Sequence, residues 1–215
     1  MTKKSKLYAF GYNAFRQTHP EIQDVIISLP TDITAFTDKI IWANINATLS
    51  EKSIKNGKDS TVLLTWGFDS VENKIISPTR KSWQRVKKCF GNDNSILGFL
   101  DIDGNIVFEK EHSRMYEISN SYTKIVDASQ FWTGNVMIVV TDGKLYNWDI
   151  EQASSEEITP TDNKIDIVFT KVVCGENHCL ALTQAGQVFK LNEGKDFGPN
   201  IIKVSCGSAH TAIVT

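Results

Sequence analysis

The chain has 215 residues and a formal net charge of -2. This length allows one large domain or two small ones, and the near-neutral charge excludes a nucleic-acid binder that relies on a strongly basic surface. No run of residues reaches the roughly 18 apolar positions of a membrane-spanning helix, and the apolar run Leu7–Phe10 is too short for the core of a secretion signal.

The N-terminal third is predicted to form strands separated by polar turns. Lys6–Gly11 reads as a strand that stops at glycine, and Glu21–Pro30 adds an extended surface strand. Lys39–Glu51 carries two strands with Asn46 at the bend between them, and Thr61–Phe68 ends on Trp-Gly. Short runs rich in Val, Ile, Phe, Tyr and Trp, separated by turn residues, indicate β-structure rather than helix.

The middle of the chain repeats this plan twice, in Val86–Lys110 and in Ile125–Ile150. Both contain a hairpin turn with glycine, which accepts the positive φ that such turns require. We expect short helical turns only at Ser82–Lys88 and Glu111–Asn120. The residues expected at the bends and turns of these two units are Gly91, Asn94, Gly104, Asn135 and Gly143.

The last two units, Lys171–Lys190 and Ile201–Thr215, are the most alike. Their alignment places Cys174 on Cys206, Gly175 on Gly207 and His178 on His210. Units spaced by some 30 to 50 residues are typical of propellers and solenoids. The sequence therefore predicts a repeat protein built from short strands.

The two ends of the chain complement each other. The final unit stops after its second strand, whereas Lys6–Gly11 matches the outer strand Lys144–Asp149 almost position for position. An N-terminal strand that completed the C-terminal blade would remove the exposed sheet edges of an open array. We expect an all-β fold, a small closed β-propeller of about five blades, formed by residues 1–215 as a single domain.

The four cysteines are Cys89, Cys174, Cys179 and Cys206. Equivalent positions in different units lie too far apart to bridge, so we expect all four to be reduced. The chain has no Cys-x-x-Cys pair, and no metal or other cofactor is expected. Reduced cysteines are typical of a cytoplasmic protein, with the nucleus as a further compartment.

The residues resemble a known repeat. Gly-x-x-His, then alternating apolar residues, then x-Gly-x-Val-Phe in Gly175–Phe189 is similar to the repeat of the regulator of chromosome condensation family. Tyr8–Asn13 with Gln17 resembles that family's Tyr-x-Trp-Gly-x-Asn-x-x-x-Gln segment. The layout is most similar to the alpha-tubulin suppressor branch of this family. The resemblance implies a β-propeller that works through protein partners.

Two partner classes follow from this resemblance. The alpha-tubulin suppressor branch implies a small zinc-binding protein as partner, in diphthamide synthesis and wobble-uridine modification of tRNA. The founding branch implies the alternative role of a guanine-nucleotide exchange factor for a Ran-like small GTPase. We expect a monomer or a heterodimer, without direct binding of nucleic acid and without a membrane association.

Two sets of residues are singled out by their place in the repeat. Phe131 and Trp132 put bulky aromatics where other units have small bend residues, so they are either part of a partner-binding face or a local plug of the core. The neighbouring loops supply the other partner-binding candidates, which are Asn92, Asp93, Glu176, Asn177, Ser208, Phe15 and Arg16.

The histidines invite a catalytic or metal-binding interpretation, but three other units have asparagine at the same place. A polar residue that satisfies the backbone of each bend explains both residue types. We therefore expect structural roles at Gly175, His178, Gly207, His210, Gly91, Asn94, Asn46 and Asn135. Since no nucleophile stands in a Gly-x-Ser-x-Gly elbow, the expected function is a non-catalytic scaffold for protein–protein interaction, not an enzyme.

Overall fold

The computed structural model describes residues 6–55, 59–69, 72–83, 85–91, 96–108, 122, 124–131, 136–159, 167–191, 195–196 and 198–215. Within these residues every regular element is a β-strand, which confirms the predicted all-β class. No helix in this described part is long and apolar enough to cross a membrane. The chain divides into two compact units: residues 1–86 with 93–95 (unit 1) and residues 87–92 with 96–215 (unit 2).

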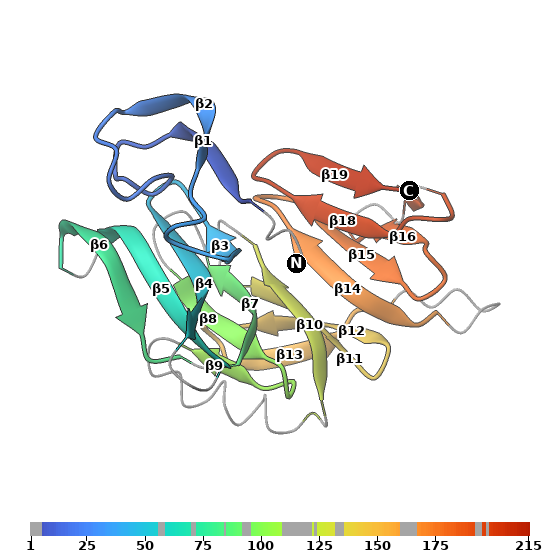
Figure 1. The fold of residues 1–215 in the computed structure, drawn as a ribbon. Coiled ribbons are helices and arrows are strands. Elements are labelled where there is room, and N and C mark those ends of the chain that lie inside the picture. The colour runs from blue at the N-terminus through green and yellow to red at the C-terminus, as the bar shows by residue number, and fades with distance from the viewer. Residues whose placement is uncertain are drawn as a thin grey trace. The chain divides into compact units, whose positions relative to one another are not determined.

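Unit 1 contains two antiparallel sheets in the described residues (Figure 1). The N-terminal hairpin is a two-stranded sheet, and the next four strands form a sheet in chain order. The strands are β1 (Tyr8–Tyr12), β2 (Ile26–Asp32), β3 (Lys39–Ala43), β4 (Ala47–Lys55), β5 (Asp59–Asp69) and β6 (Lys74–Lys81).

Unit 2 continues the pattern of strands that pair with their neighbours in chain order. Two sheets have four strands, one has three in the described residues, and the C-terminal sheet has two. The strands are β7 (Val86–Gly91), β8 (Ile96–Asp101) and β9 (Ile106–Phe108); β10 (Ile125–Gln130), β11 (Val136–Thr141), β12 (Lys144–Asp149) and β13 (Ser154–Glu157); β14 (Phe169–Cys174), β15 (Cys179–Thr183), β16 (Val188–Lys190) and β17 (Lys195–Asp196); and β18 (Lys203–Cys206) and β19 (Thr211–Val214).

Each central sheet of unit 2 buries both of its faces. In β11, Val139 packs in one cluster with the β7–β9 sheet, whereas Ile138 and Val140 pack in another with the β14–β17 sheet. In β15, Leu180 and Leu182 belong to a third cluster shared with β18. Because successive side chains of a strand point to opposite faces, a strand between two other sheets must be apolar at nearly every position. The continuous apolar runs of these strands follow from this packing.

A main-chain hydrogen bond joins each sheet of unit 2 to the next. The N–H of Ile125 donates to the carbonyl of Gly104 (3.1 Å), that of Phe169 to Gly143 (2.9 Å), and that of Ile201 to Gly186 (2.9 Å). The three acceptor glycines lie in hairpin turns of the preceding sheet and have φ of 94°, 76° and 78°. These turn glycines, of which Gly104 and Gly143 are expected from the sequence, therefore also accept a hydrogen bond from the segment where the next sheet begins.

One local expectation is wrong, and one strand was not expected. The helical turn expected at Ser82–Lys88 is wrong, because β7 already begins at Val86. Strand β6 was not expected, since its mostly exposed edge position leaves no alternation of apolar and polar residues to recognise. The second expected helical turn, Glu111–Asn120, lies outside the described residues.

The strand pairs do not determine whether the sheets close into a ring. Strand β1 pairs with β2, and β18 pairs with β19, each in a two-stranded sheet of the described residues. The number of blades, the closure of the ring and the single domain over residues 1–215 stay predictions.

The contact at Gly104 leads to a stability prediction. A Cβ added to Gly104 would lie 2.9 Å from the Ile125 carbonyl oxygen and 2.7 Å from Lys124 Cγ. Gly198 is a matched control, because its φ of +93° equals that of Gly104 within a degree and its added Cβ meets no heavy atom of the described residues within 4 Å. Gly104→Ala should therefore lower the free energy of unfolding by about 1–3 kcal/mol more than Gly198→Ala, as overpacking does. Equal losses in urea unfolding would contradict this tight junction.

Candidate functional site

The predicted partner-binding loops of unit 2 include two bends with the same geometry. Gly175–His178 joins β14 to β15, and Gly207–His210 joins β18 to β19. The N–H of the first residue donates to the carbonyl of the last in both bends, at 2.8 Å and 2.9 Å. Each bend is therefore a compact turn closed by its own main chain.

Hydrogen bonds hold the two bends against each other. The N–H of Glu176 donates to the carbonyl of Ser208 (2.9 Å), and Ser208 Oγ donates to Glu176 Oε2 (2.8 Å). His178 Nε2 lies 3.1 Å from Thr211 Oγ1 on β19. Two predicted partner-binding residues, Glu176 and Ser208, are thus brought together, and they bond to one another. Asn177, next to Glu176 in the first bend, is exposed.

The glycine of each bend makes room for the histidine ring. A Cβ added to Gly175 would lie 2.4 Å from His178 Cε1 and 2.4 Å from the carbonyl oxygen of Gly207. A Cβ on Gly207 would lie 2.2 Å from His210 Cε1. Gly175 also meets main-chain oxygens of the second bend at such distances, whereas the three atoms nearest to a Cβ on Gly207 all belong to the exposed His210 ring. The close approach of glycine and ring gives a physical reason for the Gly-x-x-His spacing.

Two cysteines next to the first bend differ from expectation. Cys174 and Cys179 form a disulfide, so the prediction of four reduced cysteines is wrong for this pair, whereas Cys89 and Cys206 are not disulfide-bonded. The distance that rules out a bridge applies to equivalent positions in different units. Cys174 and Cys179 instead face each other across one hairpin, with Cα atoms 4.1 Å apart. Directly opposed residues in an antiparallel pair are this close.

The aromatic loop candidates lie only partly within the described residues. Phe131 is half-buried and packs against the cluster shared by β10–β13 and β14–β15, which favours the core plug among the two interpretations.

In unit 1, Asn44 Oδ1 caps the β3–β4 bend by accepting the N–H groups of Asn46 and Ala47. Gly91 ends β7. The remaining candidates, Trp132, Asn92, Asp93, Asn94 and Asn135, lie outside the described residues.

The loop between β1 and β2 is built around one buried amide. Asn13 Nδ2 donates to the carbonyls of Ile22 (2.9 Å) and Asp24 (3.1 Å), and its Oδ1 accepts the N–H groups of Thr18 and His19 (3.0 and 2.9 Å). All the hydrogen-bonding capacity of the Asn13 side chain serves the loop. The asparagine that the family resemblance singled out is therefore a loop organiser.

The same loop seals the neighbouring sheet. The carbonyl of Gln17 accepts from the buried Trp66 Nε1 (2.9 Å) and from Thr48 Oγ1 (2.7 Å). Of the two candidates here, Phe15 lies 5.3 Å from Phe68, ring centre to ring centre, and Arg16 has a left-handed φ of 59°. Phe15 is thus held in place by an aromatic neighbour.

A buried histidine in this loop escaped the sequence interpretation. His19 Nδ1 accepts the N–H groups of Glu21 and Ile22, both at 3.3 Å, and its ring packs edge-on to Phe36. Burial lowers the pKa of His19, because the charged imidazolium loses hydration. A neutral ring that accepts hydrogen bonds from two main-chain N–H groups gives this histidine a structural role.

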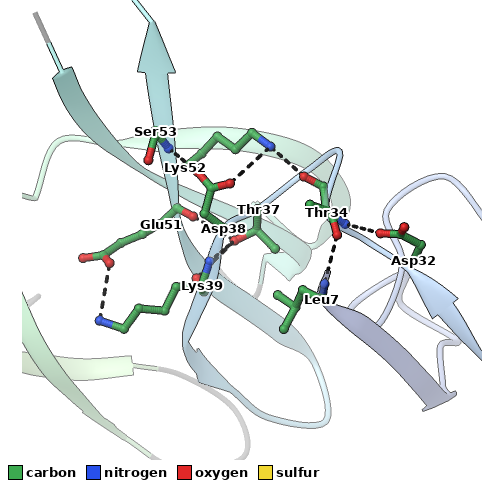
Figure 2. Close-up of polar contacts among 9 residues, drawn as sticks. All are labelled: Leu7, Asp32, Thr34, Thr37, Asp38, Lys39, Glu51, Lys52 and Ser53. Carbon is green, nitrogen blue, oxygen red and sulfur yellow. Dashed lines mark hydrogen bonds and ion pairs between the residues drawn. The ribbon is translucent and has the colours of Figure 1, made fainter. Parts of the chain in front are cut away.

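A polar network fixes the connection from β2 to β3 (Figure 2). Lys52 Nζ on β4 donates to the carbonyl of Thr34 (2.7 Å), and Asp38 Oδ2 accepts the N–H of Ser53 (2.7 Å). The buried Thr37 Oγ1 lies 2.9 Å from the Glu51 carbonyl oxygen and 3.1 Å from that of Lys39, so its one proton is shared between these two acceptors. These bonds fasten the crossover segment to β4, so the N-terminal hairpin is anchored at its second strand.

An ion pair connects the first strands of three sheets in unit 2. Lys88 Nζ on β7 lies 3.0 Å from Asp127 Oδ1 on β10 and donates to the carbonyl of Val172 on β14 (2.8 Å). Asp127 Oδ2 accepts the N–H of Val172 (2.9 Å). The Lys88 side chain is 27% exposed and that of Asp127 is 8% exposed. Burial lowers the pKa of Lys88, and the Asp127 carboxylate opposes that shift.

A double-mutant cycle tests this ion pair. Asp127→Asn leaves the Lys88 ammonium without its counter-charge, and Lys88→Met leaves the buried carboxylate alone, so each should lower the free energy of unfolding by about 3 kcal/mol. The double variant should lose less than the sum of the two, since neither charge remains. Additive losses, measured by urea unfolding, would show that the two charges do not act on each other.

Comparisons with known proteins bear on the fold. No family model matches the chain, and no curated protein matches it. Human WBSCR16 is similar in structure with a TM-score of 0.68 at 15% identity, over 98% of this chain and 67% of that one. Yeast Prp20p, studied for its binding to Gsp1p and histones, has a TM-score of 0.65 at 15% identity, over 99% of this chain and 66% of that one. At this identity the likeness shows the fold, that of an RCC1-like propeller, and the chain spans about two thirds of those chains.

Proposed function

We propose that this protein is a non-catalytic scaffold that binds a protein partner through the bends of unit 2. The observation that carries the proposal is the pair of cross-bonded bends at Gly175–His178 and Gly207–His210. Glu176 and Ser208 hold the two bends to each other through a main-chain bond and a side-chain bond. Asn177, next to Glu176 in the first bend, is exposed.

The physical basis is the low entropic cost of using a rigid surface. Ordering a mobile loop on binding costs free energy, and a loop already fixed by hydrogen bonds avoids most of that cost. Binding residues commonly sit on loops held by a rigid scaffold. The packed sheets beneath the bends, with both faces of β15 buried, supply that scaffold.

A narrower role rests on the sequence resemblance alone. It would make the partner a small zinc-binding protein, in diphthamide synthesis and wobble-uridine modification of tRNA, in the cytoplasm or the nucleus.

A comparative affinity purification tests the scaffold. Asn177→Arg places a bulky charge on the bend surface, and Ser154→Arg places the same charge on the exposed outer strand β13 as the control. Wild type and the Ser154 variant should recover the same stoichiometric partner, and the Asn177 variant should recover at least about tenfold less, as loss of one central contact does. If no stoichiometric partner is recovered, or both variants recover it equally, the bend is not the binding surface.

The alternative function is nucleotide exchange on a small GTPase. The specific observation that favours it is the structural likeness to Prp20p, whose binding to Gsp1p has been studied. Release of labelled GDP from a Ran-like GTPase, timed with and without this protein, separates the two functions. A scaffold leaves the release rate unchanged, and an exchange factor raises it.

We also propose that β1–β2 and β18–β19 complete one four-stranded blade and so close a ring of about five blades. Each is two-stranded, whereas β3–β6, β10–β13 and β14–β17 have four strands. Phe10 occupies the sequence position of Trp148, yet it is 66% exposed while Trp148 is fully buried. A cavity of about 280 Å³ also opens beside β1, and its lining includes the exposed rings of Tyr8 and Phe10. Ring closure would cover this apolar surface.

Substitution of Phe10 tests the closure. If the ring closes, Phe10 is buried in solution, and Phe10→Ser should lower the free energy of unfolding by about 1.5–3 kcal/mol. Ile45→Ser is the control, because Ile45 is 54% exposed in the β3–β4 bend. A loss no larger for the Phe10 variant than for the Ile45 variant would contradict closure.

A further inference from the structure

The outer strand of the unit 1 sheet carries an uncommon sequence. β6 is the edge strand of the sheet β3–β6, and it contains Ser77-Pro78-Thr79-Arg80. The register with β5 runs from Thr79 opposite Thr65 to Ile76 opposite Gly67, so Ser77 and Pro78 together oppose Trp66. Proline lacks a main-chain donor and is tolerated in sheets at edges and bulges, which is where Pro78 lies.

The hydroxyl at this bulge is accessible. Ser77 is exposed, and its Oγ makes no hydrogen bond to any residue in the described part of the chain. A residue that precedes proline is restricted to extended conformations, so the backbone at Ser77 is held open. Arg80, also exposed, makes no ion pair with a described residue.

We propose that Ser77 is a phosphorylation site for a proline-directed serine/threonine kinase. Such kinases modify serine or threonine directly before proline in an extended segment, and many of them prefer a basic residue three positions later, which here is Arg80. The Ser77 hydroxyl attacks the γ-phosphorus of ATP, the bond to the β–γ bridging oxygen breaks, ADP leaves, and the hydroxyl proton passes to the kinase's aspartate.

The chain holds an internal contrast. Thr159 also precedes proline, at Pro160, but Asp162 stands where Ser77 has Arg80. The Thr159 hydroxyl accepts the N–H of Leu145 at 3.0 Å, and the residue is half-buried. Recognition by sequence and by accessibility therefore both select Ser77 over Thr159.

Phosphorylation would change the charge of this edge. A phosphoserine carries about -1.5 to -2 charges at pH 7, and here it would join Lys74, Arg80 and Lys81 on one strand. These three side chains carry +3 charges together, so one phosphoserine would lower the charge of the strand to about +1 to +1.5. A protein partner or a further strand that binds to this edge would then meet a surface of different charge.

The test uses the folded full-length chain, a cyclin-dependent kinase and Mg·ATP, with intact mass and peptide mapping as readouts. One phosphoryl group should appear on the peptide that contains Ser77. Ser77→Ala should abolish it, and Thr159→Ala should leave it unchanged. Arg80→Ala should slow the initial rate about tenfold, the effect of removing one charge-assisted hydrogen bond to the kinase.

A synthetic peptide of residues 74–82 separates the motif from its accessibility. If the kinase modifies the peptide but not the folded protein, the edge strand does not present Ser77 and the proposal fails. Failure on both, or incorporation that persists in the Ser77 variant, would overturn it as well. Unchanged thermal unfolding of the alanine variants would show that lost phosphorylation does not come from lost folding.

Discussion

The architecture of unit 2 depends on one repeated main-chain contact. The first residues of β10 and β14, Ile125 and Phe169, and Ile201 just before β18 each donate an N–H group to the carbonyl of a turn glycine in the preceding sheet. A main-chain bond is independent of side-chain identity, so the sheets can diverge in sequence and still dock in the same way. The requirement falls on the glycines, because a positive φ and a close approach leave little room for a Cβ.

Side chains add further links between the sheets, and these differ from place to place. Ser208 bonds to the Glu176 side chain beside the main-chain bond between the two bends, whereas Lys88 and Asp127, within strands β7 and β10, bind to β14. A fold that is fixed by the main chain at its turns can accept different residues at its bends. This division explains why the bends are the natural place for a binding surface, and why the candidate site lies there.

The sequence predicted the features that depend on local order. Glycine turns such as Gly104 and Gly143, and the strands around Gly175, follow from spacing along the chain, and the structure has them there. It did not predict features that depend on which strands become neighbours. The Lys88–Asp127 pair is of this second kind, and so is the role of Gln17 in sealing Trp66. The Cys174–Cys179 bridge was missed because comparison between repeats hid a pairing within one repeat.

The glycine junctions are tested most directly by amide hydrogen exchange, residue by residue, with NMR detection. If each junction is part of the cooperative fold, the N–H groups of Ile125, Phe169 and Ile201 exchange only on global unfolding, with protection equal to that of the β15 core. Exchange of these three amides as fast as that of Ala185 in the exposed turn beside Gly186 would contradict the account.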